Sequence, residues 1–167
     1  MSSITLKGTP IHTSGELPKT GTHAPDFLLT KTDLSDVSLQ TYAGKTVILN
    51  IFPSIDTPVC AASVRKFNQE VSAIPDTAVL CVSRDLPFAL KRFCGAENLN
   101  NVIPVSELRN QDFGYRYGLR ITDGPLAGLI ARAVVIINKK GIIIYTQLVP
   151  EIAQEPDYNS AITAAKQ

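Results

Sequence analysis

The fold of this chain is decided by one stretch, Val47-Ile48-Leu49-Asn50-Ile51-Phe52-Pro53-Ser54-Ile55-Asp56-Thr57-Pro58-Val59-Cys60. Its apolar first half predicts a buried strand from Thr46 to Phe52. Beyond it, apolar residues recur every three or four positions and predict an amphipathic helix from Pro58 to Ser72. Thr57 is a favoured N-cap residue, and proline is favoured at the first helical position that follows. The stretch therefore reads as a strand that leads through a short loop into a helix.

Cys60 takes the third position of that helix. Unpaired backbone N–H groups and the positive end of the helix dipole favour an anion there. Free cysteine is also among the most buried residue types, and Cys60 shares a helical stripe with Val64, Phe67 and Val71, which is the pattern of an inert core residue. Because the Thr-Pro start places this thiol within the first helical turn, we interpret Cys60 as a thiolate site.

A helix terminus alone is a weak source of thiolate stabilisation. It typically supplies about 0.3–1 kcal/mol, whereas a hydrogen bond to a charged donor contributes about 1.5–3 kcal/mol. Arg132 is the candidate donor, because it opens an apolar strand-like run in which an unpaired guanidinium would be costly. The alternative for Arg132 is a strand-end residue that reaches water. Arg65 and Lys66 follow Cys60 on its own helix and are expected to point to solvent.

The other cysteines have simpler interpretations. Cys81 lies in an apolar run and is expected to be structural only, whereas Cys94 ends a short helix before a glycine, where local unfolding is cheap. That position suits a thiol that must move, and it equally suits an ordinary helix residue. Three widely spaced cysteines do not fit a disulfide-stapled module or a zinc site, and no metal is expected. A Cys–His pair is weakly supported, because the only histidines are His12 and His23.

Composition narrows the class of protein. The 167 residues fit a single domain over 1–167, and 16 basic against 15 acidic residues leave a net charge of +1 without a basic cluster. Nucleic acid and anionic membranes are therefore not expected as partners. We find no signal-peptide pattern and no apolar run long enough to cross a bilayer, so the expected location is cytoplasmic.

The remaining pattern alternates short strands and helices. In the first half we expect a hairpin over Ile4 to Thr13, two short strands between Asp26 and Tyr42, and a buried strand from Thr77 to Ser83. A helix from Leu86 to Cys94 is expected to follow, with Asp85 as its cap and Gly95 at its end. The rest is expected to be an irregular insertion from Asn100 to Gly128, a hairpin of Ala131 to Ile137 with Ile142 to Leu148, and a helix from Asp157 to Ala165.

That order predicts an α/β thioredoxin-like fold, with a central mixed sheet flanked by helices and an N-terminal β-hairpin extension. Crossover helices make the first strand pair parallel, and the late hairpin is expected to add antiparallel edge strands. Ligand sites in such sheets lie where a strand's carboxyl end feeds a helix. Cys60 follows such an end.

Several motifs resemble one known family. The spacing Pro53-x-x-x-Thr57-x-x-Cys60 is similar to the peroxidatic motif of the peroxiredoxins. Longer strings resemble its bacterial thiol peroxidase subfamily, which is of the atypical two-cysteine type, and the similarity extends over nearly the whole chain. These strings are Asn50-Ile-Phe-Pro-Ser-Ile-Asp-Thr-Pro-Val-Cys-Ala, Asp85-Leu-Pro-Phe-Ala, Arg92-Phe-Cys-Gly-Ala-Glu97, Asp123-Gly-Pro-Leu-Ala-Gly-Leu and Glu155-Pro-Asp-Tyr158.

The resemblance implies a thiol-dependent peroxidase of antioxidant defence. It implies that Cys60 is the peroxidatic cysteine, that Cys94 is the resolving one, and that they form an intramolecular redox-active disulfide. Thr57 and Arg132 would hold the peroxide oxygens and the thiolate, while Pro53 shields the pocket. It further implies a homodimer, a preference for alkyl hydroperoxides and reduction by thioredoxin, with no cofactor.

Two other classes of protein remain as alternatives. A disulfide oxidoreductase acting on protein thiols normally has a Cys-x-x-Cys pair, whereas alanine and serine follow Cys60. A non-catalytic module could use a Cys60–Cys94 disulfide as a staple worth roughly 3–4 kcal/mol, but a reducing cytoplasm would not maintain it. For the enzyme, we expect the two sulfurs to lie too far apart to bond in the reduced fold.

Overall fold

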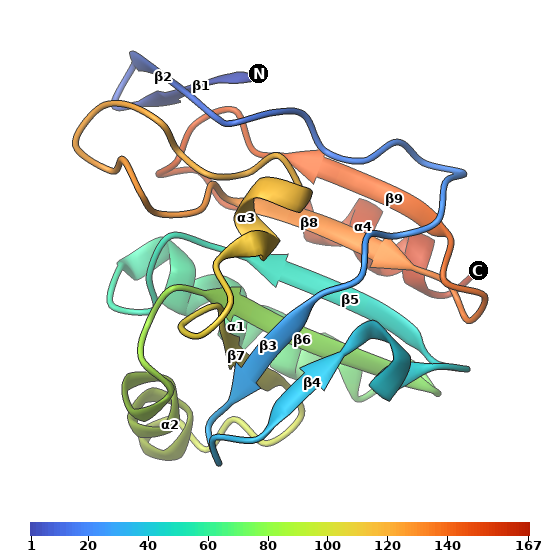
Figure 1. Cartoon of the computed structure of the whole chain (residues 1–167). Coiled ribbons are helices and arrows are strands. Elements are labelled where there is room, and N and C mark those ends of the chain that lie inside the picture. Colours follow the sequence, from blue (N-terminus) through green and yellow to red (C-terminus); the bar gives the residue numbers. More distant parts are fainter.

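The computed structural model describes residues 1–167 (Figure 1). Its elements, in chain order, are β1 (Ser3–Leu6), β2 (Thr9–His12), β3 (Leu28–Lys31), β4 (Asp36–Ser38), the 3-10 helix η1 (Leu39–Tyr42), β5 (Thr46–Ile51), α1 (Pro58–Val71), β6 (Thr77–Ser83), α2 (Pro87–Ala96), β7 (Ile103–Ser106), α3 (Asp112–Arg116), β8 (Ala133–Ile137), β9 (Ile143–Leu148) and α4 (Tyr158–Ala165). None of its helices is both long enough and apolar enough to span a membrane.

A seven-stranded mixed sheet forms the centre of the molecule. Its strand order is β4-β3-β7-β6-β5-β8-β9, and β1 pairs with β2 in a separate hairpin. The neighbours β5, β6 and β7 are parallel, while the remaining pairs are antiparallel. The α/β thioredoxin-like arrangement and the N-terminal hairpin are confirmed. The parallel strands end at one edge of the sheet, which is the edge that carries the residues considered below.

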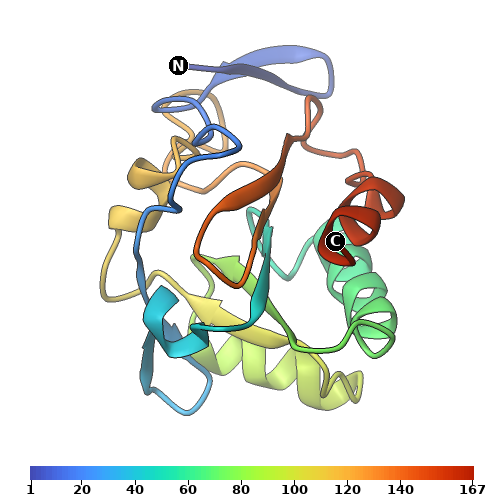
Figure 2. The same ribbon diagram turned by 90° about the vertical axis from the view of Figure 1, so that its right-hand side faces the viewer.

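The side chains of β5 alternate between two apolar cores. Val47 and Leu49 belong to the core that the N-terminal segment and α3 cover, whereas Ile48 and Phe52 face the core beneath α1 and α4. Figure 2 shows α1 and α4 side by side on one face of the sheet, with the N-terminal segment and α3 on the other. Two-sided burial explains why the strand reads as a continuous apolar run.

The middle of the chain differs from the sequence prediction. The segment expected to be an irregular insertion contains β7, which pairs parallel with β6 and antiparallel with β3. Four residues that include Pro104 carry too weak a period-two signal to be recognised as a strand. The late hairpin also does not supply two edge strands. β8 pairs with β5 inside the sheet, and only β9 lies at the edge.

The second helix is also placed differently. α2 extends through Ala96, so Gly95 lies inside it and does not end it, and the chain turns with a positive φ of 54° at Asn98. The N-cap residue is Leu86, not Asp85. The prediction of an Asp85 cap was wrong because the carboxylate of this residue is bound to another loop.

Glu151 fastens the N-terminal hairpin to the body of the protein. Its carboxylate accepts hydrogen bonds from the Thr5 hydroxyl at 2.7 Å and from the backbone N–H groups of Lys7 and Gly8, each at 3.1 Å. The backbone joins as well, since Ile152 N–H donates to the Thr5 carbonyl at 2.9 Å. These bonds, with the Thr5 hydroxyl first, lower the pKa of Glu151 from its usual 4.5 to about 2.

A depressed carboxylate pKa predicts how stability depends on pH. The ionised Glu151 favours the folded state, so its contribution is complete above about pH 4.5 and disappears as the pH falls towards 2. We expect Glu151→Gln to unfold at lower urea concentration at pH 7, with a gap from the parent protein that narrows between pH 4.5 and 2. Urea titrations at several pH values measure the gap, and a constant gap would contradict the prediction.

Candidate functional site

The site is built at the carboxyl end of β5. Pro53 is buried in the loop that leaves this strand, and Thr57 is the N-cap residue of α1 with an extended backbone. The Thr57 hydroxyl does not cap the helix. It donates instead to the carbonyl oxygen of Ser54 at 3.0 Å, and Thr57 N–H donates to the same oxygen at 3.2 Å. Cys60 occupies the third helical position, as predicted, and is completely buried.

Arg132 reaches Cys60 through the register of the sheet. β8 runs antiparallel to β5 with Ala133 opposite Ile51, so Arg132 lies beside the loop that begins at the end of β5. Its Nη2 donates to Cys60 Sγ at 3.3 Å and its Nε donates to the Ile152 carbonyl at 3.0 Å. The side chain is only 2% exposed, so the alternative of a residue that reaches water is wrong.

The guanidinium of Arg132 has no carboxylate partner. None of the ion pairs in the structure includes it, and its Nη1 is buried without a hydrogen-bond acceptor. The other buried arginine, Arg120, pairs with Glu107 at 2.6 Å. Buried cations are normally paired, so the Cys60 sulfur is the group in contact with Arg132 that can carry the opposing charge.

The loop before α1 is held by a residue that sequence reasoning assigned elsewhere. The Asp85 carboxylate accepts hydrogen bonds from Ser54 Oγ at 2.8 Å, from Ile55 N–H at 2.7 Å and from Ser83 Oγ at 2.6 Å. The available signal was its position, since Asp85 follows a buried strand by two residues at the same edge of the sheet as Cys60.

Cys81 and Cys94 lie apart from this contact, and all three cysteines are free thiols. Cys81 is fully buried in β6, where burial raises its pKa, and Asn50 Nδ2 donates to its sulfur at 3.8 Å. Cys94 is partly buried near the end of α2, and burial raises its pKa as well. It lines a groove of about 300 Å³ together with residues of β7 and the preceding loop.

A different face of α2 contacts α1. Arg65, on α1, donates two hydrogen bonds of 2.9 Å to the Glu97 carboxylate, and its guanidinium lies 5.5 Å from the centre of the Phe93 ring. Phe93 and Glu97 share a helix face because they are four residues apart. Cys94 is rotated from Phe93 by about 100° around the helix axis, so this contact does not direct its thiol towards Cys60.

Tyr158 closes the apolar side of the site. Its ring packs edge-on against Phe67 with 5.4 Å between the centres, and its hydroxyl donates to Glu155 Oε1 at 3.0 Å. Burial raises the pKa of Tyr158, and the Glu155 carboxylate raises it further, so the phenol stays protonated. The sequence marked Tyr158 only as part of a motif, without a role.

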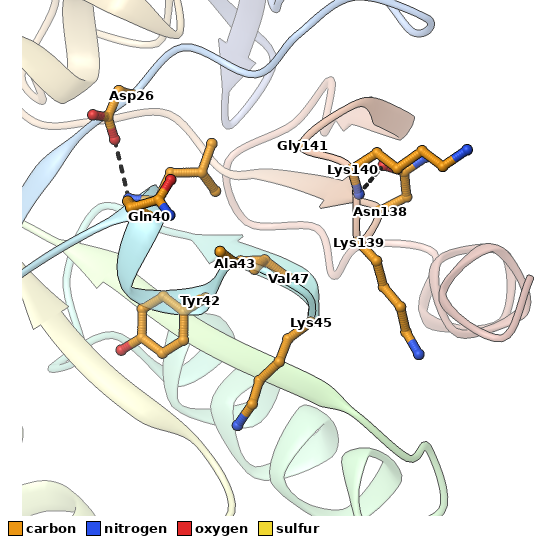
Figure 3. Close-up of a pocket in the computed structure, with 11 residues that line it drawn as sticks. Asp26, Gln40, Tyr42, Ala43, Lys45, Val47, Asn138, Lys139, Lys140 and Gly141 are labelled. Carbon is orange, nitrogen blue, oxygen red and sulfur yellow. Dashed lines mark hydrogen bonds between the residues drawn. The ribbon is translucent and has the colours of Figure 1, made fainter.

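The groove shown in Figure 3 lies at the opposite end of the sheet. It is lined by Asp26, Val47 and the turn Asn138 to Gly141, near the amino end of β5, and has a volume of about 260 Å³. Cys60 follows the carboxyl end of the same strand, so this groove does not belong to the site.

Comparisons with known proteins agree with the fold. The Redoxin family model matches residues 19–162. Thiol peroxidases of Mycobacterium bovis and Mycobacterium tuberculosis are each 57% identical to the chain over 164 residues, which is 98% of both proteins. Among solved structures, a peroxiredoxin-like protein from Aquifex aeolicus is 38% identical and has a TM-score of 0.94, with 99% of this chain and 96% of that chain covered.

A thiol peroxidase from Chromobacterium violaceum is only 21% identical and supports the fold alone, with a TM-score of 0.88 over 95% of this chain and 91% of that chain. The similarity to the mycobacterial proteins is much higher, at 57% identity over 98% of this chain. The chain therefore belongs to the Redoxin family and, within it, to the thiol peroxidases.

Proposed function

We propose that this protein reduces hydroperoxides with Cys60 as the attacking thiolate and Cys94 as the resolving thiol. The observation that carries the proposal is the environment of Arg132. A buried guanidinium contacts the sulfur at 3.3 Å and has a second nitrogen, Nη1, without an acceptor. An orphaned buried donor next to a nucleophile is a binding position for an oxygen of the substrate.

In the first step, the Cys60 thiolate attacks the terminal peroxide oxygen. A sulfur–oxygen bond forms, the oxygen–oxygen bond breaks, and the leaving alkoxide takes a proton to depart as alcohol or water. Cys60 becomes a sulfenic acid. Arg132 stabilises the charge that moves along the S–O–O axis, the Thr57 hydroxyl contacts the peroxide, and Pro53 keeps bulk water from the sulfur.

In the second step, the Cys94 thiol condenses with the sulfenic acid to form a disulfide and release water. Its sulfur lies on a different helix, beside a groove whose lining includes no residue of α1, so we propose that the end of α2 unwinds first. Burial keeps the pKa of Cys94 high in the folded helix. Unwinding exposes the thiol to water, which removes that effect and favours the nucleophilic thiolate.

An external dithiol then reopens the disulfide by exchange. We propose thioredoxin as this reductant, alkyl hydroperoxides as preferred substrates, and a homodimer working in the cytoplasm. All four proposals rest on the resemblance to thiol peroxidases.

The function is tested by mapping the cysteines after one equivalent of an organic hydroperoxide. We expect a Cys60–Cys94 disulfide within seconds, with Cys81 still free to be alkylated under denaturing conditions. Cys94→Ser should retain the first oxidation and stop at a sulfenic acid that dimedone traps, while Cys60→Ser should not react. Cys81→Ser is the matched control and should behave as the parent protein. A free Cys60 thiol in the parent after this treatment would refute the proposal.

Arg132 is expected to act mainly on the first step. Replacing it with methionine keeps an apolar stem but removes the charged donor, a contact worth about 1.5–3 kcal/mol, so oxidation of Cys60 should slow by about 10- to 150-fold. Lysine restores the charge without the fork that reaches both the sulfur and Ile152, and should be intermediate. Rapid-quench mass spectrometry measures the rates, and unchanged oxidation in both variants would exclude the role.

Two substitutions should change the second step in opposite directions. Gly95 lies inside α2 where an added Cβ meets no atom within 4 Å, so Gly95→Ala should stabilise the helix by about 1 kcal/mol and slow disulfide formation about fivefold. Arg65→Ala removes the contact with Glu97 and Phe93 and should speed disulfide formation about two- to fivefold.

The measurement for both variants is the ratio of Cys60 sulfinic acid to disulfide under excess peroxide, because a slower resolving step leaves the sulfenic acid open to further oxidation. Gly95→Ala should raise this ratio and Arg65→Ala should lower it. If both variants shift it in the same direction, unwinding of α2 does not control the step.

A further inference from the structure

We infer that Asp85 is a positioning residue of the peroxide site, which acts by holding Ser54 so that the Thr57 hydroxyl has a fixed direction. This inference rests on the proposed function, since Thr57 is taken to contact the peroxide. It is carried by a continuous set of hydrogen bonds that joins the carboxylate of Asp85 to the hydroxyl of Thr57.

The first link is between Asp85 and the loop. Asp85 Oδ1 accepts from Ser54 Oγ at 2.8 Å, and Oδ2 accepts from Ile55 N–H at 2.7 Å. Hydrogen bonds to an ionised carboxylate are shorter and about twice as strong as neutral ones. Two adjacent residues of the loop are therefore fixed by both oxygens of one side chain.

The second link is between Ser54 and Thr57. The Ser54 carbonyl accepts both the Thr57 hydroxyl at 3.0 Å and Thr57 N–H at 3.2 Å. Because that hydroxyl proton is directed at Ser54, the lone pairs of Oγ1 point elsewhere, and their direction is set by where the Ser54 carbonyl lies. The hydroxyl of Ser54 also accepts from Asp56 N–H at 3.3 Å, which completes a tight turn before the helix.

The anchor itself is rigid. Ser83, at the end of β6, donates to Asp85 Oδ2 at 2.6 Å, and Ser106, at the end of β7, donates to the Asp85 carbonyl at 2.6 Å. Both serines are fully buried. Asp85 is thus fixed to the ends of two central strands, and it transmits their position to a loop that would otherwise depend on its own backbone turns.

The test isolates the first oxidation in a full-length Cys94→Ser background, by rapid quench with an organic hydroperoxide and dimedone. Asp85→Ala should slow oxidation of Cys60 at least about tenfold, because two charge-assisted bonds to the loop are lost. Asp85→Asn keeps one acceptor oxygen and should recover part of the rate. Asp26→Ala is the matched control. Asp26 also accepts two backbone N–H bonds, from Phe27 and Leu39, but at the opposite end of the sheet, and its loss should leave the rate within about twofold.

Two further readouts separate positioning from general loosening. A loop that merely loosens would expose the fully buried Cys60 and raise its rate of alkylation by iodoacetamide, whereas positioning through Thr57 leaves that rate close to the parent's. In addition, introducing Asp85→Ala into the Thr57→Val variant should lower the rate of Cys60 oxidation by less than about twofold, since the two residues act in one chain of contacts.

Each outcome decides the inference. The inference is overturned if Asp85→Ala oxidises Cys60 as fast as its parent background, if the losses of rate from Asp85→Ala and Thr57→Val are fully additive, or if Cys60 is alkylated faster. A Cys94→Ser background whose Cys60 does not oxidise at all overturns the proposed function instead. If Asp85→Ala lacks a cooperative thermal transition, Ser54→Ala replaces it. That variant loses one bond to Asp85 and should show a smaller loss of rate that is again non-additive with Thr57→Val, and additivity there contradicts the inference.

Discussion

The burial of the Arg132 guanidinium is the constraint on which the rest of this structure depends. Moving a cation out of water costs several kcal/mol even after relaxation, and a partner must offset that cost. Arg120 has Glu107 for this purpose, whereas Arg132 has only the Ile152 carbonyl and the sulfur of Cys60. A neutral thiol leaves the charge nearly uncompensated. The fold therefore favours an anion at that position, which in the proposed mechanism is first the thiolate and then the oxygen that leaves the peroxide.

Two carboxylates fix the two sides of this contact. Glu151 binds the N-terminal hairpin and orders the turn whose next residue, Ile152, holds the guanidinium, while Asp85 holds the loop on the side of Thr57. Neither carboxylate forms an ion pair with Arg132, so neither neutralises the charge that the proposed mechanism uses to stabilise the sulfur. Electrostatic catalysis depends on such preorganisation, since dipoles that are already in place cost no rearrangement when the charge moves.

Those parts of the site that depend on local geometry could be predicted from the sequence. Thr57, Pro58 and Cys60 follow from the rules of helix starts, and Arg132 follows from the cost of a charge at the head of a buried strand. Asp85 was misassigned because its partners lie about thirty positions away, and a nearby helix start offered a simpler role. β7 was missed for a similar reason. Its strand identity comes from pairing with β6 and β3, and four residues with a proline carry little of that information.

The proposed mechanism gives the two cysteines opposite requirements, and the packing of their helices differs accordingly. α1 buries Val64, Phe67 and Val71 against the sheet and α4, so the end that bears Cys60 is held by a full apolar stripe. α2 buries only Pro87 and Leu90, both in its first half, and its last turn is held by the partly buried Phe93 and by a solvent-exposed contact with α1. The free energy of opening is therefore expected to be lower around Cys94 than around Cys60, and Cys94 is the thiol that must move in the proposed mechanism. Asp85 lies directly before the N-cap of α2 and binds the loop before α1, so the proposed unwinding of α2 from its far end would leave the contacts of that loop intact.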